Sequence, residues 1–251
     1  MLHPTLPDDT PTTANGRYVY KSLGTWSSAS DVDVFLSRFT HANDYKDGDT
    51  ELALGNYVTI QDGTYNAKWM IAGFDMEHNQ TAADGTVYDN GLGICMIPVI
   101  HVTNGHWNYD NTINGGYNSS IMNTAVLPGI VTNLQNILGS HIVERNVLLS
   151  NNCNSAGSYS YNWTTAYATL MNVGQMTGTF ASHQNKYDDG EANYKLPIFD
   201  NMTYSTGYNF WLRGILHHAN AYYVSSNGEI GSMYFGYAGG SYYVRPLIYL
   251  R

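Results

Sequence analysis

The stretch Phe210-Trp211-Leu212-Arg213, together with Val244-Arg245-Pro246-Leu247-Ile248 at 244–248, is the most informative part of this 251-residue chain. The residues between these two strand-like flanks are rich in Tyr, His, Asn, Ser and Gly, types that give contact area and adaptable hydrogen bonds at binding surfaces. The pattern predicts a rigid frame of strands that presents a binding face. We expect the contact residues to be His217, His218, Asn220, Tyr222, Asn227, Tyr234 and Tyr237.

Two residues of the flanks are expected to serve the fold rather than a ligand. Trp211 lies in an apolar strand, which predicts a buried side chain. Arg245 directly precedes a proline and carries a fork of hydrogen-bond donors, which can bind loop carbonyls or a carboxylate.

The W-L-R opening at 211–213 and the V-R-P ending at 244–246 resemble the C-terminal half of C-type-lectin-like domains. They are similar to an uncharacterised domain family of phage and Gram-positive surface proteins, and to the variable proteins that phages diversify for receptor binding. The resemblance covers residues 48–251 and includes 116–121, which is similar to the family's Ser-initiated helix. It implies an α+β, C-type-lectin-like fold with two main helices and a twisted, mostly antiparallel sheet.

The resemblance implies a function as well. It suggests a non-enzymatic structural protein of a bacteriophage particle, located in the virion, which binds a host-surface glycan or protein in a receptor-binding or fibre role. The implied partners include other virion proteins and identical chains, most often in a trimer. Two alternatives remain open: a capsid or tail decoration protein that binds only virion subunits, and a hydrolase of cell-wall glycans.

The composition is compatible with this function. Charged residues make up 12% of the chain and hydrophobic residues 43%, with 22 Tyr, so a globular fold with an amphipathic, hydrogen-bonding surface is expected. The same composition also fits an ordinary β-rich protein. The net charge of −9 and the scattered Lys and Arg argue against nucleic-acid binding and against attraction to an acidic membrane.

The chain is expected to have three parts. Residues 1–17 contain three prolines and little apolar surface, and are either a disordered tail or an extended arm that orders on a neighbouring subunit. Residues 18–47 form a connector with a helix over 31–39, capped by Ser30. Residues 48–251 form the lectin-like domain. No apolar segment resembles a secretion signal or a membrane span, which predicts synthesis in the host cytoplasm.

Within the domain, residues 57–60 and 68–74 predict a hairpin and 94–102 a central buried strand. A helix should begin at Ser119 or Ser120, divide at Pro128 and end at Gly139. A second helix is expected to begin at Thr164. Further strands are expected at 141–149, 210–212, 221–225, 229–235 and 242–250.

Cofactors and catalytic residues are not expected. The pairs His101/His106 and His217/His218 lack the spacing and the nearby carboxylates of a zinc site. The segments 84–86 and 89–91 resemble fragments of calcium loops but are also typical of turns. The calcium motifs of sugar-binding lectins, the G-x-S-x-G nucleophile motif and the phosphate-binding G-K-[ST] ending are absent.

The two cysteines favour no metal or redox motif. Cys95 lies in an apolar run and is expected to be a small buried hydrophobe, whereas Cys153 is expected in a loop. A disulfide between them remains open.

Overall fold

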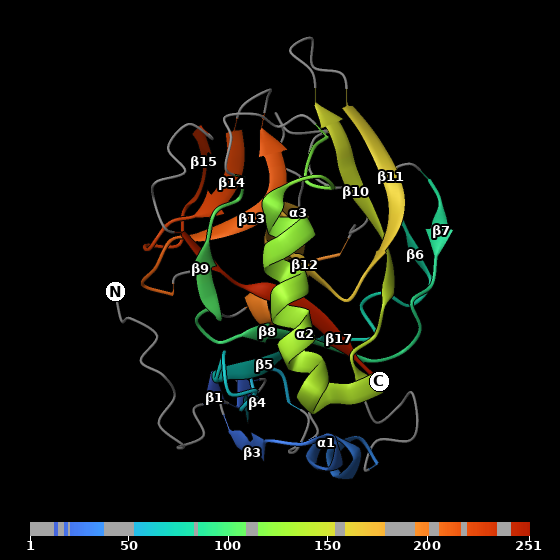
Figure 1. The fold of residues 1–251 in the computed structure, drawn as a ribbon, viewed down its shortest axis with the longest axis vertical. Coiled ribbons are helices and arrows are strands. Elements are labelled where there is room, and N and C mark those ends of the chain that lie inside the picture. The colour runs from blue at the N-terminus through green and yellow to red at the C-terminus, as the bar shows by residue number, and fades with distance from the viewer. Residues whose placement is uncertain are drawn as a thin grey trace.

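The computed structural model describes residues 13–14, 18–19, 21–37, 53–82, 85–108, 115–153, 159–178, 194–200, 206–216, 220–234 and 242–251. Two larger sheets and three helices give the α+β class that the sequence predicts (Figure 1). Within these residues, no helix has both the length and the apolar character needed to cross a membrane.

The larger sheet has six strands. Their order is β12 (Ala168–Leu170), β17 (Pro246–Leu250), β8 (Ile94–Pro98), β5 (Ala67–Phe74), β4 (Tyr57–Ile60) and β3 (Ser22–Trp26). Only the β3–β4 pair is parallel among these five pairings. Strand β8 is central and its residues are buried, which confirms the strand predicted over 94–102 for residues 94–98, whereas residues 99–102 lie outside it. Strands β4 and β5 form the predicted hairpin.

The second sheet carries most of the predicted binding face. Its order is β15 (Ile230–Tyr234), β14 (Asn220–Val224), β13 (Phe210–Leu216), β16 (Tyr242–Val244) and β9 (Thr103–Gly105). Strands β13, β14 and β15 are antiparallel neighbours, as the turn-separated strands of the sequence predict. Strand β16 joins β13 in parallel and β9 antiparallel.

The chain passes from one sheet to the other twice, between β8 and β9 and between β16 and β17, and these two crossings lie side by side. Strand β8 leads into β9 and β16 leads into β17, while β8 pairs with β17 and β9 pairs with β16. Arg245 lies at this crossing and is 1% exposed. Its Nε donates to the carbonyl of Pro98 at 2.8 Å and its Nη2 donates to that of Val99 at 3.2 Å. The prediction that Arg245 binds loop carbonyls is therefore confirmed.

The first helix differs in its bounds from the prediction. Helix α1 spans Ala29–Leu36, and its N-cap is Ser28 rather than Ser30. The helix starts earlier because the Asp31 carboxylate reaches back and accepts the backbone N–H groups of Ser27 and Ser28 at 2.8 and 2.9 Å. Trp26 packs on Phe35, and both side chains belong to the main core.

Pro128 does not divide two helices. A π-helical turn, Met122–Val126, passes directly into α2 (Leu127–Leu138), and Pro128 occupies the first turn of α2. Pro128 lacks a backbone donor, and the π-helical turn lies directly before it in the continuous helical segment. Gly139 caps the C-terminus of α2 as predicted, and a 3₁₀ turn, Gly139–His141, follows.

The prediction of a helix from Thr164 is wrong. These residues end β11 (Tyr159–Ala166), which pairs antiparallel with β10 (Arg145–Cys153), because Thr164 and Thr165 are β-branched and favour a strand. The short helix follows as α3 (Val173–Thr177), whose N-cap Asn172 accepts the N–H of Gln175 at 2.7 Å.

Smaller elements complete the described part of the chain. The two-stranded pairs are β1 (Thr13–Ala14) with β2 (Tyr18–Val19) and β6 (Gln80–Thr81) with β7 (Val87–Tyr88), and a 3₁₀ turn spans Pro197–Asp200. Cys95 is buried and carries a free thiol, as expected for a small hydrophobe. Cys153 ends β10 rather than lying in a loop.

Candidate functional site

The predicted binding face is described only in part. His217, His218 and Tyr237 lie outside the described residues, as does the side chain of Tyr234, whose backbone ends β15. Asn220 begins β14 and is half-buried. Asn227 is exposed in the turn between β14 and β15, where its side-chain oxygen accepts from Ser225.

Tyr222 corrects the prediction. Its side chain is 2% exposed and belongs to the main core, so it does not project toward a ligand. Successive residues of a strand face opposite sides of the sheet, and the neighbouring Tyr223 is the half-buried one. Of the two adjacent tyrosines, Tyr223 is therefore the one that can contribute to a surface.

The face of this sheet that carries Tyr223 has a row of aromatic rings, of which Tyr223 is half-buried and the others are buried. Trp211 and Tyr242 have ring centroids 4.5 Å apart, and Tyr242 and Tyr223 lie 5.0 Å apart. Tyr223 covers Gly231 of the next strand, where an added Cβ would come within 3.0 Å of the ring. Trp211 is 3% exposed and its Nε1 donates to the carbonyl of Gly105 at 2.9 Å. Its predicted burial is confirmed.

A second cluster, which we call the aromatic edge, consists of His101, Tyr208 and Tyr243. The His101 ring lies 3.9 Å from Tyr243 and 5.1 Å from Tyr208, and the two tyrosine rings are 4.8 Å apart. Tyr208 is 42% exposed. Burial, and then the charge of Arg245, lowers the pKa of His101, so its ring is neutral at pH 7 and can stack as an apolar surface.

Sequence reasoning missed the aromatic edge. In the sequence, His101 suggests only a possible metal ligand. The predicted contact residues lie between Arg213 and Val244, whereas Tyr208 precedes this range and Tyr243 is at its end. The crossing of the sheets brings the three residues together, since Tyr243 precedes the crossing and His101 follows strand β8. The sequence does contain one local indication: Tyr208 lies just before the strand that starts at Phe210, and Tyr243 directly precedes Val244.

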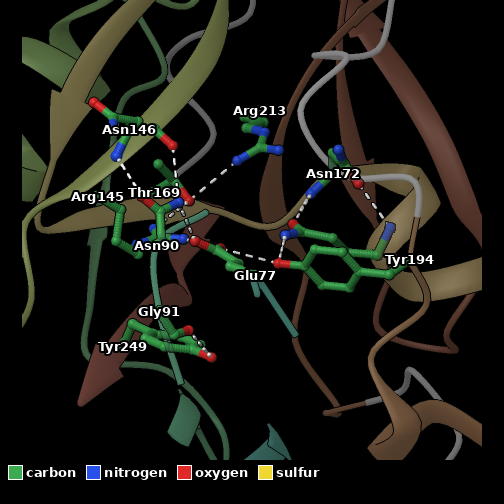
Figure 2. A network of polar contacts seen from close by, with 11 residues as sticks. Glu77, Asn90, Gly91, Arg145, Asn146, Thr169, Asn172, Tyr194, Arg213 and Tyr249 are labelled. Atoms are coloured by element: carbon green, nitrogen blue, oxygen red, sulfur yellow. Dashed lines mark hydrogen bonds and ion pairs between the residues drawn. The ribbon is translucent and has the colours of Figure 1, made fainter. Parts of the chain in front are cut away.

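The interior contains a polar network centred on Glu77 (Figure 2). Glu77 and Arg145 are 1% and 0% exposed and form an ion pair. The other carboxylate oxygen of Glu77 accepts from Asn90 Nδ2 at 2.9 Å, while the oxygen that faces Arg145 also accepts the Tyr194 hydroxyl at 2.9 Å.

The network extends into several elements. The Thr169 hydroxyl accepts from Arg145 Nη2 at 3.3 Å and from Arg213 Nη1 at 3.1 Å, and Gln175 Nε2 donates to the Tyr194 hydroxyl at 3.0 Å. These contacts join β10, β12, β13 and α3 to the turn after β5 (Figure 2). Because its charged groups are buried, the network can fix the relative positions of these elements but offers no surface to a substrate.

Burial perturbs several ionisable groups near Glu77. The pKa of Tyr194 is raised well above 10.0, first by burial and then by the Glu77 charge. The pKa of Tyr249 is also raised, first by burial and then by the neighbouring Cys95 and Glu77. Burial also raises the pKa of the Cys95 thiol well above 9.0. All three groups are therefore neutral in the folded protein over the ordinary pH range.

Stability is expected to fall at alkaline pH. The folded pKa of each of these groups lies above its unfolded value, so the folded state retains protons that the unfolded state loses, and stability declines once pH exceeds about 9–10. Melting temperatures should be measured from pH 7 to pH 11. Because an unfolded cysteine loses its proton at lower pH than an unfolded tyrosine, the melting temperature of the wild type should begin to decline at lower pH than that of Cys95→Ala. Parallel curves for the two proteins would contradict this assignment for Cys95.

In the described part of the chain, no three His, Cys, Asp or Glu side chains lie close enough together to hold a metal ion. Asp84 lies outside the described residues. Asp89 accepts the N–H of Gly91 at 2.7 Å, a turn contact of the kind that the alternative interpretation of 89–91 predicts.

Comparison of the chain with protein-family models, with curated proteins and with solved structures found no match.

Proposed function

We propose that this chain is a lectin-like, non-enzymatic binding module of a bacteriophage particle, which contacts a host-surface ligand through the second sheet. The observation that carries the proposal is the aromatic edge: three rings in mutual contact, one of them 42% exposed, beside the buried frame residue Arg245. Exposed tyrosines suit protein or glycan contact because each combines an apolar ring with a hydroxyl.

The frame supports a surface of fixed shape. Strands β13 and β16 hold Trp211 and Tyr242 between them, and Arg245 fastens the end of β16 to the end of β8. A surface that is already ordered loses little conformational entropy when a ligand binds. The resemblance of the W-L-R and V-R-P strands to C-type-lectin-like domains agrees with such a role, and under this proposal the partners are other virion proteins, identical chains in a trimer, and a host glycan or protein.

Replacing Tyr208 by Ala tests the proposal. Interface energy concentrates in a few aromatic anchors, so the substitution should weaken binding of the labelled protein to cells of the particle's host by about 1–3 kcal/mol. The matched control is Val34→Ala, which truncates an exposed apolar side chain on α1, 55% exposed and outside the second sheet. Unchanged cell binding by Tyr208→Ala and by Tyr243→Ala, with both variants folded, would rule out the aromatic edge as the contact surface.

A further inference from the structure

A hollow of about 360 Å³ lies outside both main sheets. It is lined by Thr86, Val87, Tyr88, Asp89, Asn146 and Trp163, and so lies between β7 and the β10–β11 ribbon. Figure 1 places β7 beside β11, away from β13, β14 and β15. Its volume is at the lower end of the range of small-molecule sites, which is about 300–1,000 Å³.

One side of the hollow is an exposed aromatic wall. Trp163 is 36% exposed, and its ring lies 5.3 Å from that of Tyr88, which is 7% exposed. Tyr88 belongs to a small apolar cluster with Ala82 and Leu148 that is separate from the main core. The cluster contacts the indole through Tyr88, and Leu148 is the strand partner of Trp163. Val87, which is 70% exposed, adds apolar surface to the hollow.

The hollow also carries two hydrogen-bonding side chains, the carboxylate of Asp89 and the neutral amide of Asn146. The Asp89 carboxylate accepts from the Gly91 N–H at 2.7 Å and lies 3.0 Å from His78 Nδ1. These contacts, that of Gly91 first, lower the pKa of Asp89, so it is ionised at neutral pH. Asn146 contributes an exposed amide side chain. Among the residues that the structure describes, no Lys or Arg lines the hollow.

The buried network fixes the distance between the two walls. Asn90, next to Asp89, accepts the N–H of Asn146 at 2.8 Å and donates to its carbonyl at 3.0 Å (Figure 2). The same Asn90 amide donates to Glu77, which pairs with Arg145, the neighbour of Asn146 on β10. The polar groups and the indole are therefore held apart at a set spacing before any ligand arrives.

We propose that this hollow binds one ring of a neutral saccharide. The C–H face of a pyranose can stack on the Trp163 indole, and its hydroxyls can donate to the Asp89 carboxylate and exchange hydrogen bonds with the Asn146 amide. A phosphate-bearing ligand is disfavoured, because the described lining of the hollow offers a carboxylate and no Lys or Arg. This site is distinct from the aromatic edge and does not depend on the role proposed for it.

Calorimetric titration with a panel of hexasaccharides tests the proposal, using α-1,4-glucan, β-1,3-glucan, galactan and N-acetylglucosamine oligomers, with poly(glycerol phosphate) as an anionic probe. The full chain should bind at least one hexasaccharide saturably. Trp163→Ala should weaken that binding at least about tenfold, corresponding to ~1.4 kcal/mol, whereas Trp163→Phe should retain most of it. Asp89→Asn, which keeps the shape of the side chain, should weaken it severalfold.

Tyr208→Ala is the control that separates the two surfaces, since it should leave saccharide affinity unchanged. The proposal is overturned if no hexasaccharide binds the wild type up to millimolar concentration, or if only poly(glycerol phosphate) binds. It is also overturned if Trp163→Ala binds like the wild type, or if Tyr208→Ala loses as much affinity as Trp163→Ala. Equal losses in Trp163→Ala and Trp163→Phe would exclude ring stacking as the source of the affinity.

Discussion

Replacing Glu77 by Gln should lower the free energy of unfolding by about 3–5 kcal/mol at neutral pH. The substitution keeps the shape of the side chain but leaves Arg145, which is 0% exposed, without its carboxylate partner. The Tyr194 hydroxyl and the Asn90 amide also lose a charged acceptor, and hydrogen bonds to charged groups are worth more than those to neutral groups. Urea unfolding followed by tryptophan fluorescence measures the loss.

A surface ion pair provides the matched control. Lys195 Nζ lies 2.9 Å from the Asp200 carboxylate, and the Asp200 side chain is 52% exposed. Asp200→Asn should therefore cost less than about 1 kcal/mol. The double variant Glu77→Leu, Arg145→Met should recover part of the stability lost in Glu77→Gln, because no unpaired charge remains buried. If Glu77→Gln cost no more than Asp200→Asn, the buried pair would not be the centre of the network's stability.

Replacing Trp211 by Ala should cost about 3–5 kcal/mol of unfolding free energy. The side chain is 3% exposed, its ring packs on Tyr242, and its Nε1 hydrogen bond to Gly105 links β13 to β9 across the intervening strand. Truncation leaves a cavity and removes that link. Urea unfolding and the melting temperature report the loss.

The same substitution at an exposed position is its control. Trp163→Ala removes a side chain that is 36% exposed and should cost clearly less, while Trp211→Phe should lose about 1 kcal/mol for the hydrogen bond in addition to a smaller packing loss. A Trp211→Ala variant that kept wild-type stability but lost cell binding would make Trp211 a contact residue instead of a frame residue.

The sequence was most informative for short segments whose own hydrophobicity is enough to predict that they are buried. The apolar run at 94–98 and the hairpin strands at 57–60 and 67–74 were identified because their hydrophobicity suffices to place them in a core. It was ambiguous at β14, where Tyr222 and Tyr223 are chemically identical and only the pairing register decides which of them faces inward.

The buried network could not be predicted in the same way. Glu77 and Arg145 are 68 positions apart, and neither lies in a local pattern that names the other. Their pairing depends on the β5–β8 and β10–β11 registers together, which only the folded chain determines. The hollow beside Trp163 could not be predicted either. Trp163 and Thr164 both belong to β11, and a helix predicted from Thr164 does not place Trp163 on a strand.

The pairing of β17 with β8 also constrains when the protein can fold. Residues 246–250 lie between residues 94–98 and 168–170 in the six-stranded sheet, so an emerging chain exposes the edges of β8 and β12 until residues 246–250 have left the ribosome. Arg245 can then close the crossing only in the final step of sheet assembly. The six-stranded sheet is thus expected to be completed only after residues 246–250 have been synthesised, with a period of aggregation risk before then.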